Sequence, residues 1–377
     1  MKTRVQARGY FGKFTGRPSR FFIHAAGESG FTLVELMVTI VISLFALAAT
    51  TTLFAQLFTQ FKQESRVSQT DIGSALGLEY LRKDIQSAGY GLPWNVTGVA
   101  YNESAIANAL TNDVPPNAPR AIFSINGKGL NGSDYLVIKS QMAAVNDSAA
   151  GKSTRLDQDG KPWPWNDPNW DLNPSDNVIV VSTIDNTVSL VNNAGAFSVL
   201  YNGVSAYAPT SSTEKTRMIY GVADAADAPN GLRMPYNRAD YFIDNSPDDI
   251  AQPQRCAPGT GQLVKAVVNQ KDGNFTYYPI LHCVADMQVI FDLGNNSYSN
   301  DIFTNPLNAA QIRQQVQGVR VYILAQEGQK DPSYTYPSNS IYVGEFGMGH
   351  DFPLTGDQKH YRWKVYHIIE KPMNLGQ

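Results

Sequence analysis

The sequence is poor in the residues that carry most catalytic and metal chemistry. Its 377 residues include five histidines and two cysteines, and the histidines are scattered. It contains no Gly-x-Ser-x-Gly motif, and no histidine accompanies a nucleophile at a recognisable spacing. Residues 151–153 read Gly-Lys-Ser, like the end of a phosphate-binding loop, but the glycine needed five positions earlier is Asn146. We therefore expect no enzymatic activity.

Positive charge is not in excess either. The chain has 30 lysines and arginines against 33 aspartates and glutamates, a formal net charge of −3. Six of the basic residues and one glutamate lie in residues 1–30, so that segment carries +5 and the remainder −8. Because an acidic remainder would repel a phosphate backbone, no nucleic-acid partner is expected.

Charged residues are also absent from one long stretch near the N-terminus. Between Glu35 and Lys62 lie 26 residues without a charge, a proline or a glycine. As a helix this run would rise about 39 Å, enough to cross a hydrocarbon layer of about 30 Å. It is longer than the apolar core of a secretory signal peptide. The pattern predicts a membrane-spanning helix over residues 31–61 with the basic segment in the cytoplasm, and a plain signal anchor is the alternative.

The residues that open this run resemble the type IV prepilin signature. Residues 30–37 read Gly-Phe-Thr-Leu-Val-Glu-Leu-Met. The resemblance implies that prepilin peptidase cuts after Gly30, removes the leader 1–30 and methylates the new N-terminal Phe31. Glu35 is then the fifth mature residue, which in the family pairs with the N-terminal amine of a neighbouring subunit. A carboxylate at the edge of a membrane is costly, so such pairing would give Glu35 a role in setting assembly register.

The helix is predicted to continue beyond the membrane with a different character. In residues 62–89, Leu78 and Leu81 belong to an apolar series at spacings of three and four among charged residues, which is typical of an amphipathic helix. Gly73 and Gly77 are expected to weaken this part. Glycines and a proline directly afterwards predict its end.

The rest of the chain is predicted to be β-strand and loop. Short apolar or alternating runs bounded by Asn, Gly, Pro and Asp indicate strands at 134–139, 177–183, 262–269, 274–281, 286–292, 316–325, 340–346 and 361–369. Short connections, including Asp272-Gly273, favour antiparallel pairing. We therefore expect an α+β, type IV pilin-like fold, in which the long N-terminal helix packs on an enlarged antiparallel β-rich domain. Residues 90–260 would form an elaborated β and loop region, and residues 261–377 a pilin-like C-terminal sheet.

Four further segments sharpen the resemblance. Residues 81–90 look like the helix end of PilW-type minor pilins, and residues 284–289, 316–324 and 361–366 look like that family's final strands. The type II secretion pseudopilin J component has a similar layout but is usually much shorter. The resemblance implies a single-pass inner-membrane protein with a periplasmic domain, which joins a pilus at the cell surface after processing. Its implied partners are other major and minor pilins and the assembly platform, and a pilin-anchored adhesin is a further alternative.

The two cysteines lie in the region that would be exported. An even pair in an oxidising compartment favours a disulfide between Cys256 and Cys283. The alternative, a metal or thiol site that uses the adjacent His282, matches no known ligand spacing.

Two features of the middle region are ambiguous. Asp157 and Asp159 have the spacing that opens a calcium loop, with Asp167 nearby, but the twelfth position is Pro168 rather than glutamate. An irregular calcium site and a simple polar turn therefore both stay open, and no other cofactor is expected. Three tryptophans among prolines at 163–170 could bind a sugar or a partner protein, or could fold onto their own core.

Overall fold

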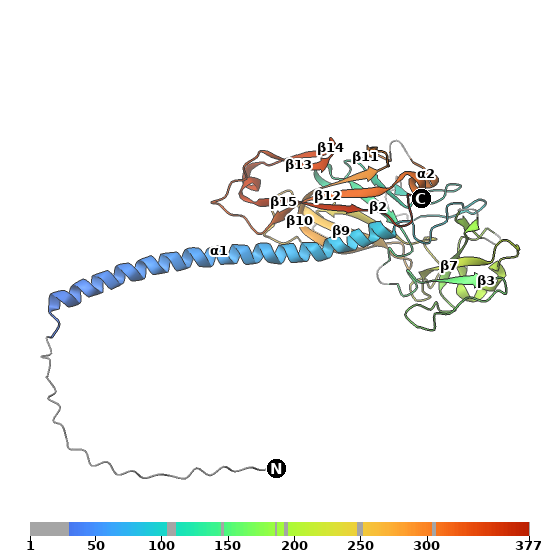
Figure 1. Ribbon diagram of the computed structural model, residues 1–377, viewed down its shortest axis with the longest axis horizontal. Coiled ribbons are helices and arrows are strands. Elements are labelled where there is room, and N and C mark those ends of the chain that lie inside the picture. The colour runs from blue at the N-terminus through green and yellow to red at the C-terminus, as the bar shows by residue number, and fades with distance from the viewer. Residues whose placement is uncertain are drawn as a thin grey trace, which may run out of the picture. The chain divides into compact units, whose positions relative to one another are not determined.

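The computed structural model describes residues 30–103, 111–144, 147–184, 187–191, 195–246, 252–303 and 307–376. The predicted leader, up to residue 29, lies outside the described residues. The chain divides into two compact units, residues 1–60 and 61–377, which are described separately. The predicted pilin-like α+β fold is confirmed, because a long apolar N-terminal helix precedes an antiparallel β-rich domain (Figure 1).

Helix α1 (Leu33–Ser87) begins in the first unit and ends in the second. Its segment Leu33–Lys62 is long and apolar enough to cross a membrane, and its side chains are exposed. Threonine hydroxyls there bond back to the preceding turn, for example Thr39 to the carbonyl of Leu36 at 2.9 Å and Thr59 to that of Ala55 at 2.8 Å. The hydroxyls of these threonines are thus satisfied within the helix, as a lipid environment requires.

The main sheet has eight strands, all paired antiparallel. Its order is β1 (Ile122–Ile125), β2 (Tyr135–Lys139), β8 (Arg238–Asp244), β9 (Gly261–Val268), β10 (Phe275–Asp292), β12 (Gly318–Glu327) and β15 (Arg362–Glu370), and β11 (Tyr298–Ser299) pairs with β10. The expected hairpin at Asp272-Gly273 is confirmed between β9 and β10, where Gly273 has a positive φ of 79°. The strands expected at 274–281 and 286–292 are one strand, β10, with register shifts between Pro279 and Val284.

Alternating side chains of the main sheet belong to two hydrophobic cores, one on each face of the sheet. In β12, Val321 and Ile323 join the core that contains Leu81 and Ile85 of α1. Tyr322 and Leu324 point the other way, as successive strand residues must, and join a second core. That second core is completed by the hairpin of β13 (Ser340–Glu345) and β14 (Met348–Pro353). The sheet is therefore covered by the end of α1 on one face and by this hairpin on the other (Figure 1).

A second sheet is inserted between β2 and β8. Its order is β3 (Ser153–Asp157), β7 (Thr216–Ala223), β4 (Asn177–Ser182) and β5 (Ser189–Leu190), and β6 (Val199–Leu200) pairs with β4. It has its own small core, which includes Leu156, Val180 and Ile219. Because β8 returns to the main sheet and pairs with β9, the division expected at residue 260 does not coincide with a division between sheets.

Short helices complete the fold. They are η2 (Leu130–Gly132), η4 (Tyr201–Tyr207), α2 (Ala309–Gln315) and η5 (Gly356–His360). Helix α2 opens with a reciprocal cap between Asn308 and Gln311, whose side chains each accept a hydrogen bond from the other's backbone at 2.9 Å.

Candidate functional site

The prepilin-like motif forms a compact hydrogen-bonded start to α1. The hydroxyl of Thr32 accepts a hydrogen bond from the backbone N–H of Glu35 at 3.2 Å. The carboxylate of Glu35 accepts in return from the backbone N–H and the hydroxyl of Thr32, both at 3.0 Å. This is a capping box, which satisfies donors that a helix start leaves unpaired. Gly30 and Phe31 directly before it are exposed, as a cleavage site must be.

The capping box gives Glu35 a contact within its own chain. Reasoning from the sequence assigned this carboxylate to a neighbouring subunit only. The signal for the local role was in the sequence, because Thr-x-x-Glu before an apolar run is the pattern of a capping box. The same carboxylate is therefore held at the helix start before any partner is present.

Cys256 and Cys283 are joined by a disulfide. Their Cα atoms lie 5.0 Å apart, and Cys283 is buried within β10. The bond ties the loop before β9 to the strand in the middle of the main sheet. It therefore restrains the connection between β8 and β9, two strands of the main sheet.

The weak calcium candidates serve separate local contacts. Asp157 accepts a hydrogen bond from the indole of Trp163, Asp159 accepts from the backbone N–H of Lys161 at 3.1 Å, and Asp167 accepts from that of Asn169 at 2.9 Å. Among the described residues they do not form a group of three metal-ligating side chains. Calcium binding at these aspartates stays a prediction, and a fall in melting temperature on adding a chelator would support it.

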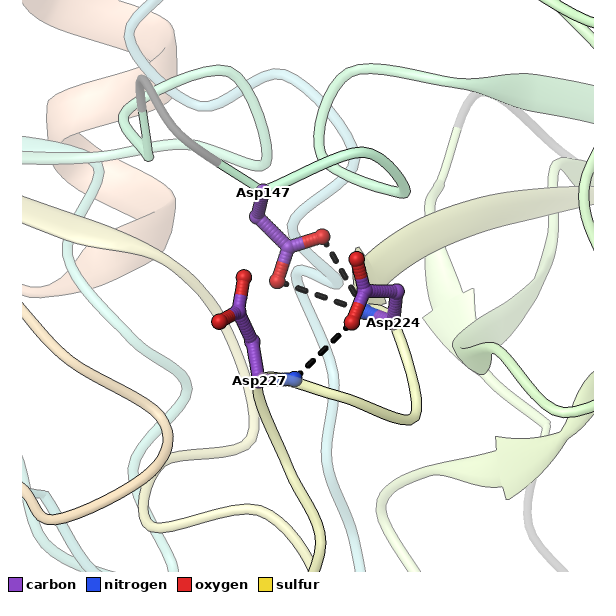
Figure 2. Close-up of side chains that lie close together, drawn as sticks. All are labelled: Asp147, Asp224 and Asp227. Atoms are coloured by element: carbon purple, nitrogen blue, oxygen red, sulfur yellow. Dashed lines mark hydrogen bonds between the residues drawn. The ribbon is translucent and has the colours of Figure 1, made fainter.

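A different set of carboxylates does come together. Asp147, Asp224 and Asp227 place ligand atoms within 4.8 Å of one another (Figure 2). Asp147 accepts from the backbone N–H of Asp224 at 3.0 Å, and Asp224 accepts from that of Asp227 at 2.8 Å. Three oxygen ligands of this kind suit a hard divalent cation. This cluster could not be recognised from the sequence, because 77 residues separate its first two members.

The cluster is electrostatically unfavourable without a cation. Partial burial raises the pKa of Asp147 to about 6, and the nearby charges of Asp224 and Asp227 add to this effect. Burial and the charge of Asp224 also raise the pKa of Asp227. Burial acts in the same direction on Asp224, but hydrogen bonds from backbone N–H groups and Ser148 outweigh it and lower that pKa. Ionisation is therefore less favourable than in water for Asp147 and Asp227, and more favourable for Asp224.

Replacing Asp147 with asparagine should stabilise the protein at pH 8, by roughly 1 kcal/mol after discounting for partial exposure. The folded-state pKa lies above the unfolded value, so the wild type is favoured while this group is protonated and loses that stability as pH rises from about 4 through 6. The amide oxygen can still accept from Ala149 and Asp224, which both bond to one carboxylate oxygen. Thermal unfolding at pH 4 and pH 8 measures the difference.

Asp159→Asn is the matched control, because it removes an exposed carboxylate that accepts one backbone hydrogen bond. It should change the melting temperature little at either pH. Equal effects of Asp147→Asn at pH 4 and pH 8 would contradict the electrostatic interpretation.

The three tryptophans of the inserted region lie at its surface. Trp163, Trp165 and Trp170 are 51%, 62% and 61% exposed, so they do not fold onto a core of their own. They occupy the connection between β3 and β4 in the second sheet.

Comparison with known proteins supports the interpretation of the N-terminus. Residues 26–51 match the family described as "Prokaryotic N-terminal methylation motif". No curated protein and no solved structure matches the chain. The motif, with the apolar helix behind it and the β-rich domain after it, is typical of prepilin-type proteins of the pilin and pseudopilin class. Such a motif implies processing by prepilin peptidase and membrane anchoring before assembly.

Proposed function

We propose that the protein is a minor pilin of a type IV pilus, of the PilW type, that promotes pilus assembly and lies near the tip. The observation that carries the proposal is the methylation motif joined to an unusually large β-rich domain. Before assembly the protein is a single-pass inner-membrane protein with its sheets in the periplasm. After cleavage behind Gly30, the chain begins at Phe31 and enters a filament at the cell surface.

The assembly step follows from the chemistry of the new N-terminus. Cleavage gives Phe31 an amine in a poorly solvated setting, and a carboxylate from an adjacent subunit can neutralise it. Glu35 is four residues away and already held at the helix start by Thr32. Exchange of the Thr32 hydrogen bonds for a methylated amine of another subunit fixes the axial offset between two apolar helices. Packing of the apolar helices then buries the surface that stabilises the filament, and Glu35 sets the axial register between subunits.

The size of the domain favours a minor subunit over the repeating one. An eight-stranded main sheet, a hairpin layer and an inserted five-stranded sheet would all repeat along a thin fibre if this were the major pilin. At the tip, by contrast, no further subunit follows, so the inserted sheet clashes with no neighbour there. The role near the tip is supported by this steric argument.

A pseudopilin of a type II secretion system is the second candidate, favoured by the same N-terminal motif. Deletion of the gene distinguishes the two. Loss of surface pili with normal secretion of hydrolases supports the pilus. Loss of hydrolase secretion with normal pili supports the secretion system.

Glu35→Ala should leave cleavage after Gly30 intact and abolish incorporation into filaments, because the carboxylate that meets the amine of Phe31 is gone. The measurement compares sheared surface filaments with membranes by mass spectrometry, which also reports the processed N-terminus. Glu64→Ala is the matched control, because Glu64 is an exposed glutamate of α1 beyond the apolar segment. Normal incorporation of Glu35→Ala would refute the register role.

A further inference from the structure

The inserted sheet carries an aromatic surface that the assembly of a filament does not use. We call residues 161–171 the tryptophan loop; it contains Trp163, Trp165 and Trp170, each more than half exposed. Exposed tryptophans gathered in one loop are uncommon on a soluble surface and indicate a binding site.

The loop is anchored along β3 rather than hanging free. The backbone N–H of Trp163 donates to the carbonyl of Arg155 at 3.0 Å, and the hydroxyl of Thr154 donates to the carbonyl of Trp163. Leu156 and Pro162 form an isolated antiparallel bridge. Residues 162–165 therefore run beside β3, and this segment contains both Trp163 and Trp165.

A second set of bonds fixes the turn that carries Trp170. The carboxylate of Asp171 accepts from the backbone N–H of Trp165 at 2.6 Å and from that of Asp167 at 3.0 Å. The buried amine of Lys152 donates to the carbonyl of Asp171 at 2.8 Å. Trp170 donates its backbone N–H to the carbonyl of Asp167 at 2.9 Å. These hydrogen bonds therefore connect the turn that carries Trp170 to the segment that carries Trp163 and Trp165.

The indole N–H groups of two tryptophans are bonded to β3, which leaves an uncovered ring face of each for a ligand. The indole N–H of Trp163 donates to Asp157, and that of Trp165 donates to the carbonyl of Ser153 at 2.7 Å. The guanidinium of Arg155 lies 3.4 Å from the ring centre of Trp163 and covers one face of it. A ligand would meet flat rings whose orientation is already fixed, so little conformational entropy is lost on binding.

We propose that the tryptophan loop is a carbohydrate-binding surface for the sugar rings of a neutral glycan. The C–H face of a pyranose is flat and apolar and matches an indole face, while its hydroxyls need donors and acceptors at the rim. Exposed Asp159, Lys161, Asn166 and Asn169 supply both around the rings. Acidic side chains outnumber basic ones there, with four aspartates (157, 159, 167 and 171) against Arg155 and Lys161, so the rim does not favour an anionic glycan.

The size of the surface favours a few sugar rings over a protein partner. A tryptophan offers about 150–250 Å². At the observed exposures the three together present roughly 250–450 Å². A stable protein interface uses about 800 Å² on each partner. The tryptophan loop therefore covers a short oligosaccharide fully and a protein interface only in part.

The test is calorimetric titration of the full-length protein in a detergent without a sugar headgroup. The probes are cellotetraose, chitotetraose, maltotetraose and mannotetraose. At least one should bind, and Trp165→Ala should weaken that binding at least tenfold with the melting temperature unchanged. If Trp165→Ala disturbs the loop, Trp170→Ala serves instead, because the hydrogen bond described for Trp170 is through its backbone.

Tyr342→Ala is the matched control, an exposed aromatic on β13 outside the loop, and should bind the probe like the wild type. Absence of binding by all four probes at millimolar concentration overturns the proposal, as does binding that neither tryptophan variant weakens. Capture of another purified pilin subunit that is lost in the tryptophan variants, without glycan binding, assigns the surface to a protein and also overturns it. The assay uses isolated protein, so its outcome is independent of the pilus or secretion assignment.

Discussion

Replacement of Arg238 with methionine should lower the free energy of unfolding by about 3–5 kcal/mol, because it leaves buried carboxylates without their cation. Arg238 lies on β8 and is fully buried. Its guanidinium contacts Asp240 at 2.6 and 2.7 Å and Glu103 at 2.8 Å. Methionine fills a similar volume, so the loss would report the charge rather than a cavity.

Arg238 belongs to a buried ionic network that ties Glu103, Asp113 and Arg120 to the main sheet. Lys139 on β2 contacts Glu103 at 2.5 Å and Asp113 at 2.6 Å, and Arg120 contacts Asp113 at 2.6 Å. Although burial acts to raise it, the charges of Lys139 and Arg120 hold the pKa of Asp113 below its usual value. Among the described residues the network is balanced, with three cations and three carboxylates. Removal of one cation from a balanced buried set leaves a net negative charge in a poorly solvated place.

Chemical denaturation of the purified protein measures the effect. Lys330→Met is the control, because Lys330 pairs with Asp357 at 2.6 Å at the surface, where solvent screens the interaction. The control should shift the transition little. If Arg238→Met shifts it no more than Lys330→Met does, water reaches the network and the argument from burial fails.

The same network explains which strands the sequence did not reveal. Strand β8 reads Arg-Ala-Asp-Tyr-Phe-Ile-Asp and is not among the strands expected from the sequence, because charged residues at 238 and 240 interrupt its apolar pattern. Both can be fully buried because Arg238 neutralises Asp240 and also the distant Glu103. Arg238 and Glu103 are 135 residues apart in the chain, so the local sequence around β8 does not indicate that they pair. Strands with apolar runs, such as β4 and β12, were predictable because consecutive apolar residues indicate burial directly.

The candidate sites also divide into those formed by adjacent residues, which could be predicted, and those formed by distant residues, which could not. The prepilin-like motif could be predicted because cleavage, methylation and helix capping all act on a contiguous run of residues. Both cysteines could be paired by counting, since the chain has only two. The cluster of Asp147, Asp224 and Asp227 could not be predicted, because a turn after β7 and a loop before β3 meet only in the folded chain. The exposure of the tryptophans likewise depends on how the loop is tied to β3.

Gly77 gives the second large effect, and here the expectation from the sequence needs a physical correction. Glycine in a helix lowers stability by about 1 kcal/mol relative to alanine, so both Gly73 and Gly77 were expected to weaken α1. At Gly77, however, a Cβ atom would lie 2.0 Å from the carbonyl oxygen of Ile280 on β10. At Gly73 a Cβ would meet nothing within 4 Å. Gly77 therefore permits a close approach of α1 to β10, whereas Gly73 has no such role.

Gly77→Ala should therefore destabilise the protein by about 1–3 kcal/mol, because backbone in β10 cannot yield as a flexible side chain could. Gly73→Ala, with the same chemical change four residues earlier, should stabilise it by about 0.5–1 kcal/mol through helix propensity alone. Opposite shifts of the melting temperature in full-length protein would locate the contact between α1 and β10 at Gly77. Shifts of the same sign would mean that the helix does not approach β10 so closely, and the packing of Leu81 and Ile85 on the sheet would need another register.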